Sequence, residues 1–240
     1  MPLPKINTPT FELELPSTGK KIKYRPFLVK EEKILLMALE TEDTKQISNG
    51  VIQILNDCIL TRGVKVQNLA TFDIEYLFLN VRAKSVGESV EVNITCPDDG
   101  ETMVEMDIDL DSIKVIKNKD HNKIVNLDDT YSMKLKYPSF DQFIDNNFET
   151  TNNISDVKKS LDVIVSCIEM VYDNEESWNA SDCSKKELVE FLDQLNTKQF
   201  KQIETFFTTM PKLSHTVTVK NPNTGVESEV VLEGLASFFS

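Results

Sequence analysis

Residues 71–94 read TFDIEYLFLNVRAKSVGESVEVNI, and the spacing of the apolar residues changes within this stretch. From Thr71 onward apolar side chains fall on nearly all sides of a helical period, which predicts a buried helix that ends near Gly87, with a strand as the alternative. From Val90 to Ile94 apolar and polar residues alternate, as they do in a strand with one buried face. A helix followed by such a strand predicts an α+β protein.

The segments around this stretch complete a first half of the chain. A Pro-x-x-Gly turn at residues 97–100 and a return strand over 103–110 close a hairpin after the helix. Upstream, alternating apolar residues predict a strand pair, and apolar residues spaced three and four apart predict two helices. The strand pair covers residues 11–15 and 22–24, and the helices cover residues 31–40 and 47–59.

The second half repeats this order of elements. Alternation predicts a strand pair, helical spacing predicts further helices, and a second Pro-x-x-Gly turn at residues 222–225 predicts a final hairpin. The strand pair covers 125–127 and 133–137, the helices cover Val157–Val171, 188–195 and 200–207, and the hairpin covers 217–219 and 226–232. Residues 174–184 are expected to form a polar loop.

Short echoes in the sequence relate the two halves: Cys167-Ile168 repeats Cys58-Ile59, and residues 136–138 resemble residues 23–26. We therefore predict two related α+β halves, each with a strand pair, a helical cluster and a terminal β-hairpin with a zinc-ribbon-like turn lacking metal. The halves are residues 1–111 and 124–240, the second with an extra helix near residue 188, and residues 112–123 connect them. The alternative is a chance recurrence of common elements.

Composition limits the classes of function. Hydrophobic residues make up 40% and charged residues 27%, so the chain is expected to fold around a core. The 39 acidic and 26 basic side chains leave a formal charge of −13, which disfavours nucleic acid as a partner. No apolar run approaches the roughly 20 residues of a membrane span, and the N-terminus lacks a signal-peptide pattern. We therefore expect a soluble protein that is not exported and has no membrane partner.

The sequence offers no catalytic or cofactor-binding residues. Seven glycines leave no Gly-rich phosphate loop, and the motifs of hydrolases, metalloproteases and P-loop proteins are missing. His121 and His215 lie among polar residues and are expected to be ordinary surface histidines. We expect a protein that is not an enzyme and has no small-molecule substrate.

One stretch needs comparison with a metal site. Cys96-Pro97-Asp98-Asp99-Gly100 has the form of a zinc-ribbon knuckle, but Asp99 stands where the second cysteine would be. The turn in the second half offers Asn221 and Thr224 instead of thiols, so we expect no metal site. The four cysteines have no framework spacing and are expected to be free thiols.

Two charged stretches are candidates for partner binding. Seven acidic residues and no basic ones lie between Asp98 and Asp111; they are expected to be the solvated face of a strand, with calcium or a basic partner as alternatives. The other stretch is basic and contains Lys20, Lys21, Lys23 and Arg25. These residues either protect an edge strand against aggregation or form half of an electrostatically steered interface.

The C-terminal segment is a third candidate. Leu235, Phe238 and Phe239 are apolar residues at the end of the chain, where residues fray unless something holds them. These residues either dock on the protein's own core or anchor a partner, because aromatic residues are enriched in interface cores.

Four segments suggest a family: LPSTGKKIKYRPFLVKEEKILL (15–36), FDIEYLFLNVRAKSVGE (72–88), MPKLSH (210–215) and LEGLASFF (232–239). They are similar to the baseplate hub assembly proteins of T-even-type contractile-tailed bacteriophages. The resemblance implies a non-enzymatic assembly factor that binds baseplate hub or tape-measure proteins in the host cytoplasm. It also implies that position 99 is often cysteine, and Asp99 departs from that pattern. The alternative is a structural subunit retained in the tail baseplate of the virion.

Overall fold

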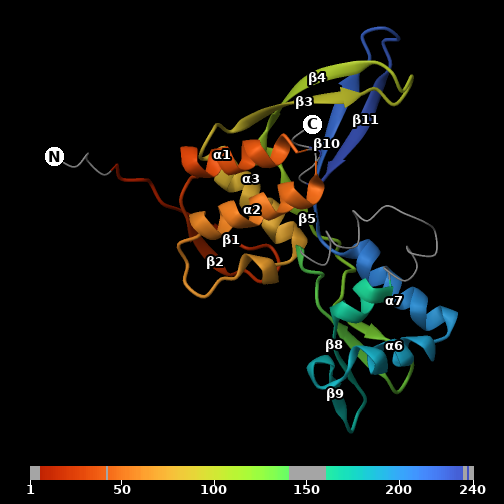
Figure 1. The fold of residues 1–240 in the computed structure, drawn as a ribbon. Helices are drawn as coiled ribbons and strands as arrows, with labels where there is room; N and C mark the ends of the chain where they lie inside the picture. Colours follow the sequence, from red (N-terminus) through yellow and green to blue (C-terminus); the bar gives the residue numbers. More distant parts are fainter. Residues whose placement is uncertain (1–5, 42, 141–160, 235–236, 238–240) are drawn as a thin grey trace. The chain divides into compact units, whose positions relative to one another are not determined.

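The chain forms short helices and several small antiparallel sheets, which confirms the predicted α+β class (Figure 1). The computed structural model describes residues 6–41, 43–140, 161–234 and 237.

The helices are α1 (Val29–Leu39), α2 (Thr44–Cys58), α3 (Thr71–Ala83), α6 (Lys185–Asp193) and α7 (Thr197–Thr209), with 3-10 turns η1 (Val66–Asn68), η2 (Leu110–Ser112) and η3 (Ala180–Asp182). The strands are β1 (Phe11–Glu14), β2 (Lys21–Tyr24), β3 (Ser89–Thr95), β4 (Met103–Asp109), β5 (Lys114–Ile116), β6 (Ile124–Asn126), β7 (Ser132–Leu135), β8 (Ile168–Tyr172), β9 (Ser177–Asn179), β10 (Lys212–Lys220) and β11 (Glu227–Glu233).

The chain divides into two compact units, which differ from the predicted halves. Unit 1 combines Met1–Ile116 with Lys212–Ser240, and unit 2 is Lys117–Pro211. The final hairpin therefore belongs with the N-terminal part of the chain and not with residues 124–211. The cause is β5, which lies inside the predicted connector 112–123 and pairs with the start of β10, residue Ser214 opposite Lys114.

Helix α3 forms the centre of unit 1, as its apolar sequence predicts. Ile74, Leu77 and Phe78 have no exposed surface. Leu79 and Ala83, near the end of the helix, join a core cluster with the hairpins β3–β4 and β10–β11. These two hairpins lie side by side although more than 100 residues separate them in the sequence (Figure 1). The buried end of α3 thus lies where the two hairpins meet.

Unit 2 is built on a four-stranded sheet with the order β6-β7-β8-β9. Leu192 of α6 and Ile203 and Phe206 of α7 pack with the sheet in one core. Helices α6 and α7 are predicted correctly, and both begin with a capping box, at Ser184 and Asn196.

Two predictions in unit 2 are wrong at the level of secondary structure. The helical stripe predicted over Val157–Val171 ends at Cys167, because Ile168 begins strand β8 and pairs with Leu135 of β7; Val157 lies outside the described residues. The predicted polar loop 174–184 contains strand β9 and turn η3. Apolar residues at three- and four-residue steps do not show where a helix ends. Pairing of residues 168–172 with β7 sets the end of this helix at Cys167.

The two cysteine echoes occupy similar positions. The Arg25 N–H donates to the Cys58 carbonyl at 3.0 Å in unit 1, and the Lys136 N–H donates to the Cys167 carbonyl at 2.8 Å in unit 2. In each case the cysteine ends a helix and the chain then returns to the preceding strand. Descent of the two halves from one ancestor remains a prediction.

Candidate functional site

The basic stretch lies on strand β2 and the turn before it. Lys20, Lys21 and Lys23 are exposed, and Lys21 Nζ lies 3.4 Å from a carboxylate oxygen of Glu12 on β1. The Lys23 N–H donates to the Thr61 hydroxyl at 2.7 Å, and its carbonyl accepts from Leu60 at 2.8 Å. Strand β2 therefore has β1 on one side and, at Lys23, residues Leu60 and Thr61 on the other. The lysine side chains remain available to a partner, but this strand is not a free edge.

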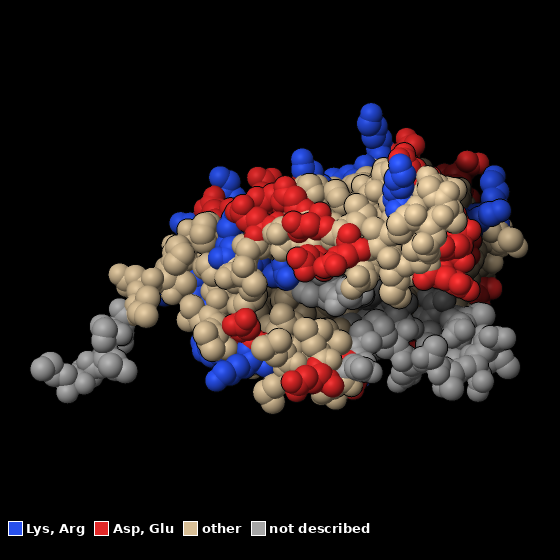
Figure 2. Space-filling model, turned by 90° about the horizontal axis from the view of Figure 1, so that it is seen from above, with Lys and Arg blue, Asp and Glu red and all other residues tan. Residues whose placement is uncertain are grey.

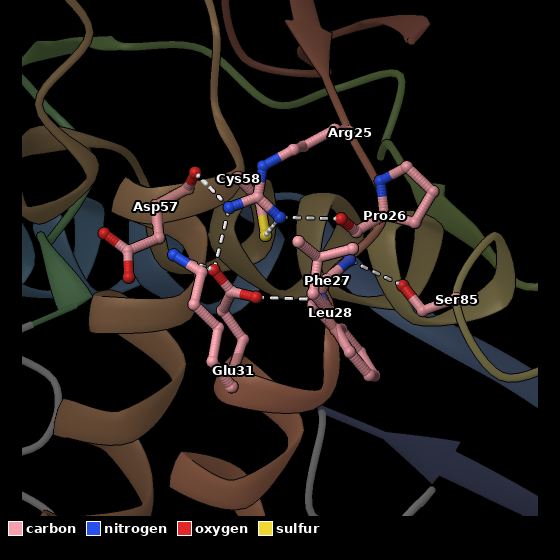
Figure 3. Close-up of polar contacts among 9 residues, drawn as sticks. Arg25, Pro26, Phe27, Leu28, Glu31, Asp57, Cys58 and Ser85 are labelled. Carbon is pink, nitrogen blue, oxygen red and sulfur yellow. Dashed lines mark hydrogen bonds and ion pairs between the residues drawn. The ribbon is translucent and has the colours of Figure 1, made fainter. Parts of the chain in front are cut away.

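Arg25 differs from the three lysines because its guanidinium points into unit 1 (Figure 3). Its Nη2 donates to Glu31 Oε1 at 2.7 Å and to the Asp57 carbonyl at 3.0 Å, and its Nη1 donates to the Pro26 carbonyl at 2.9 Å. Only 14% of the side chain is exposed. The structure therefore assigns Arg25 to internal packing and does not place it on the basic surface with which it was predicted.

Glu31 is the partner that holds this network together. Its carboxylate has no exposed surface and also accepts from the Leu28 N–H at 2.8 Å and from Lys30 Nζ at 2.9 Å. Burial alone would raise its pKa, but the hydrogen bonds from Arg25 and Leu28 outweigh burial and lower the pKa to about 2. The sequence signal was an acid in the first turn of a helix, which is usually an exposed residue.

The buried thiols Cys58 in unit 1 and Cys167 in unit 2 are poor nucleophiles. Burial raises the pKa of Cys58 to about 11, although Arg25 Nη1 lies 3.7 Å from its sulfur. Burial also raises the pKa of Cys167 to about 11. Since the thiolate is the nucleophile, these two free and fully buried cysteines act as core residues.

His121 is not the surface residue that the sequence suggested. Its ring packs 5.1 Å from the ring of Phe206, its Nδ1 lies 3.0 Å from the Thr209 hydroxyl, and its Nε2 lies 3.1 Å from the Tyr137 hydroxyl. Burial, with a smaller contribution from Lys123, lowers its pKa. The imidazole, bonded at both nitrogens, links Tyr137, which follows β7, to Thr209 of α7. The polar residues next to His121 in the sequence did not indicate these contacts.

The two Pro-x-x-Gly turns adopt similar geometry. Gly100 N–H donates to the Cys96 carbonyl at 2.9 Å, and Gly225 N–H donates to the Asn221 carbonyl at 2.8 Å. Both glycines have φ between 70° and 80°, a conformation that side chains with a Cβ disfavour. The predicted equivalence of the two turns is therefore matched in their hydrogen bonds.

The two turns also bond directly to each other. Asn221 Nδ2 donates to Asp98 Oδ1 and Oδ2 at 3.0 and 3.1 Å and to Asp99 Oδ2 at 2.8 Å. Thr224 Oγ1 donates to Asp98 Oδ2 at 2.5 Å. We call this group the turn clasp; it consists of Asp98, Asp99, Thr102, Asn221, Asn223 and Thr224. Asn221 is 1% exposed, so the clasp has a buried centre.

In a zinc ribbon the four ligands would stand at positions 96, 99, 221 and 224, and three of these residues, Asp99, Asn221 and Thr224, belong to the clasp. Hydrogen bonds from Thr224 and Asn221 lower the pKa of Asp98, and bonds from Thr102 and Asn221 lower that of Asp99, so both remain charged acceptors for the opposite turn. Among the described residues, no group of three or more His, Cys, Asp or Glu is arranged to hold a metal ion. One thiol and one carboxylate beside an amide and a hydroxyl do not match the cysteine and histidine ligand sets of structural zinc sites.

A shallow cleft of about 340 Å³ lies in unit 1 beside α3. Its lining includes Tyr76 and Asn80 of α3 together with Leu110, Ile113 and Val115. Its charged residues are Glu14, Asp111 and Lys114, and its lining contains neither histidine nor cysteine. The cleft thus offers neither a thiol nor an imidazole to a bound molecule.

The apolar C-terminal residues Leu235, Phe238 and Phe239 lie outside the described residues. Strand β11 ends at Glu233, and Gly234 follows with φ of 71°. A Cβ at Gly234 would lie 3.1 Å from a carboxylate oxygen of Glu75 on α3. The last described turn therefore passes close to α3.

Charge on the surface is uneven. Acidic side chains gather in groups on the face shown in Figure 2, with basic side chains dispersed around them. In strand β4, Glu105, Asp107 and Asp109 are exposed and Ile108 is buried, which agrees with the predicted solvated face. In the described part of the chain, no helix is both long and apolar enough to cross a bilayer.

Comparison with known proteins identifies the family. A family model described as T4 bacteriophage base plate protein matches residues 8–240. The chain belongs to this family. Comparisons with curated proteins and with solved structures found no match. The match to the base plate family covers almost the whole chain and includes residues of both units.

Proposed function

We propose that this protein promotes assembly of the central hub of the baseplate without catalysing a covalent reaction. It does so by binding hub or tape-measure proteins in the host cytoplasm. The family match over residues 8–240 carries the baseplate role. The finer assignment to the hub rests on the similarity of residues 15–36 and 72–88 to hub assembly proteins.

Helix α1 supports a role in protein binding. Its inner face buries Glu31, Leu35 and Ala38, but Leu36 is 54% exposed and Met37 is 69% exposed. Contiguous exposed apolar surface marks interaction sites, and we expect Leu36 and Met37 to belong to such a surface. Methionine adapts to partners of different shape because its side chain is unbranched and flexible.

A role without chemistry is supported by the sites that could have carried a reaction. The Cys58 and Cys167 thiols are held neutral by burial, and both nitrogens of His121 are occupied. The cleft beside α3 contains none of these residues.

The test is assembly in cells infected by the phage with its own copy of the gene disabled, with the protein supplied from a plasmid. We expect wild-type protein to restore hubs, measured by gradient sedimentation and protein composition. Met37→Asp should lower hub yield at least several-fold while the protein folds normally. Met103→Asp is the matched control, because Met103 is also 69% exposed but lies on β4. Equal loss in both variants, or hubs that form without the protein, would contradict the proposal.

The second candidate is a structural subunit that stays in the hub. The family description, a base plate protein, favours this candidate. Mass spectrometry of purified virions separates the two roles. A transient factor is expected to be present far below one copy per baseplate, and a subunit is expected in constant proportion to other hub proteins.

A further inference from the structure

Trp178 ends a row of core residues that crosses the sheet of unit 2. Val125 pairs with Met133, Met133 with Val171, and Val171 with Trp178, so all four side chains lie on the same face. The first three are at least 93% buried, whereas Trp178 on the edge strand is 41% exposed. The row of core residues is therefore buried as far as Val171 of β8, and Trp178, at its end, is partly exposed to solvent.

Tyr131 adds a second aromatic side chain at the same place. It precedes β7, is 40% exposed, and its ring centroid lies 6.4 Å from that of Trp178. We call these two residues the aromatic edge. Tryptophan and tyrosine in exposed positions are the side chains most enriched among those that dominate protein interfaces.

The main chain beside the aromatic edge can accept another strand. Within the described residues β9 pairs only with β8, and Ser177, Trp178 and Asn179 are all exposed. In the turn between β8 and β9, the Asp173 N–H donates to the Glu176 carbonyl at 3.0 Å, so Asp173 and Glu176 form a hydrogen-bonded pair. Because bonded and non-bonded pairs alternate in an antiparallel ladder, the main-chain groups of Ser177 and Asn179 point away from β8.

The loops around the aromatic edge carry only negative charge. Residues 124–133 and 168–184 contain no lysine or arginine. The acids of the two adjoining turns are Asp128, Asp129, Asp173, Glu175 and Glu176. Backbone N–H groups bond the carboxylates of Asp128 and Asp173 and lower the pKa of each, which keeps them ionised. A cationic partner is favoured here, and a phosphate-bearing one is repelled.

We propose that the aromatic edge docks an extended segment of another baseplate protein that carries lysine or arginine, added as a strand beside β9. Backbone bonds to Ser177 and Asn179 would supply affinity, and cations over the Trp178 and Tyr131 rings would supply selectivity. The inference rests on the proposed function as a binding protein and adds the site and the chemistry of the partner.

A second copy of this chain is a poorer occupant. Its basic strand β2 already pairs with β1, and at Lys23 it is bonded on the other side by Leu60 and Thr61. That strand cannot add to β9 without unfolding part of unit 1.

The test uses the full chain, whose only tryptophan is Trp178. The probe is a nine-residue peptide that alternates lysine and valine, blocked at both ends. We expect saturable binding with a blue shift of tryptophan emission, weakened by added salt. A glutamate–valine peptide should bind about tenfold more weakly or not at all. A lysine–valine peptide N-methylated at alternate residues should also lose binding, because it cannot pair with β9.

Variants then locate the site. With a labelled peptide followed by anisotropy, Trp178→Ala and Tyr131→Ala should each weaken binding about fivefold or more. Val231→Ala, at a 54% exposed position on β11, should not. Circular dichroism checks that each variant folds.

Four outcomes would overturn the proposal: no saturable binding at millimolar peptide, equal binding of the two charge types, full binding of the N-methylated peptide, or a dimer in sedimentation that Trp178→Ala dissolves. None of these bears on hub assembly in infected cells, so failure of the docking site and failure of the proposed function remain distinguishable.

Discussion

The Asn221 side-chain amide donates to both oxygens of the Asp98 carboxylate, at 3.0 and 3.1 Å, across 123 positions of sequence. The bond joins the turn of β10–β11 to the turn of β3–β4. Hydrogen bonds thus hold together two turns that, in a zinc ribbon, a metal ion would join.

Replacing Asn221 by alanine should destabilise unit 1 by about 1–3 kcal/mol, because a buried amide that serves two carboxylates is lost. Urea unfolding of the full chain measures the change. Asn223→Ala is the control, since Asn223 is exposed and its side-chain amide makes one bond in the clasp, to Thr102 at 3.0 Å. Equal effects of the two substitutions would show that the Asn221 bonds contribute nothing particular.

Restoring thiols at the clasp should create a zinc site. Asp99→Cys, Asn221→Cys and Thr224→Cys add three cysteines to Cys96. Each turn would then carry the C-P-x-C-G spacing, with four cysteines in all. We expect one tightly bound zinc per chain and, with cobalt, the absorbance of a tetrahedral thiolate site. The triple variant without Cys96, made with Cys96→Ser, should bind much more weakly. Zinc that binds both variants equally would count against the alignment of the four positions.

Glu31→Gln should cost about 3–5 kcal/mol of stability, because it leaves the largely buried Arg25 guanidinium without its carboxylate. Lys21→Ala removes the ion pair between β2 and Glu12, but at a lysine side chain that is 70% exposed, and should change stability by less than about 1 kcal/mol. Chemical denaturation of both variants gives the comparison. A small effect of Glu31→Gln would mean that Arg25 is solvated in solution.

Stability should fall in acid through Glu31. The folded-state pKa of about 2 lies below the ordinary value of 4.5, so the carboxylate stabilises the fold above about pH 4.5. This contribution is lost as the pH falls from 4.5 toward 2. Unfolding free energies measured between pH 7 and pH 3 should show the decline, and Glu31→Gln should flatten it. The same slope in wild type and variant would assign the decline to other carboxyl groups.

The double variant Phe238→Ala, Phe239→Ala should keep its melting temperature and fail to support hub assembly, if the C-terminal segment anchors a partner. A lowered melting temperature would instead mean that the rings dock on the protein's own core. Thermal melting and the infected-cell assay are needed together. No change in either would leave both interpretations without support.

Local patterns in the sequence predicted much of the fold, because α3, the hairpins β3–β4 and β10–β11, and helices α6 and α7 are each formed from one continuous stretch of the chain. Strands β8 and β9 were missed, since β8 is a short apolar segment and β9 a short polar one, and each becomes a strand only through its pairing partner. The lysines of β2 are exposed, as basic residues usually are. The inward turn of Arg25 depends on Glu31 and Asp57, and the clasp depends on residues more than 100 positions apart. No local pattern reveals such pairs.

Strand β5 has consequences for synthesis on the ribosome. Its pairing partner β10 begins about 100 residues later in the chain, after the whole of unit 2. At roughly 5–20 residues per second, the ribosome makes Lys212 at least several seconds after Ile116. During that interval the core cluster that α3 forms with β3–β4 lacks its residues from the last hairpin, and unit 2 can fold first. Slow codons for residues 117–211 would lengthen the time for which unit 1 waits for β10. Slow translation there, or a chaperone bound to the chain at that stage, would therefore affect the folding of unit 1 more than that of unit 2.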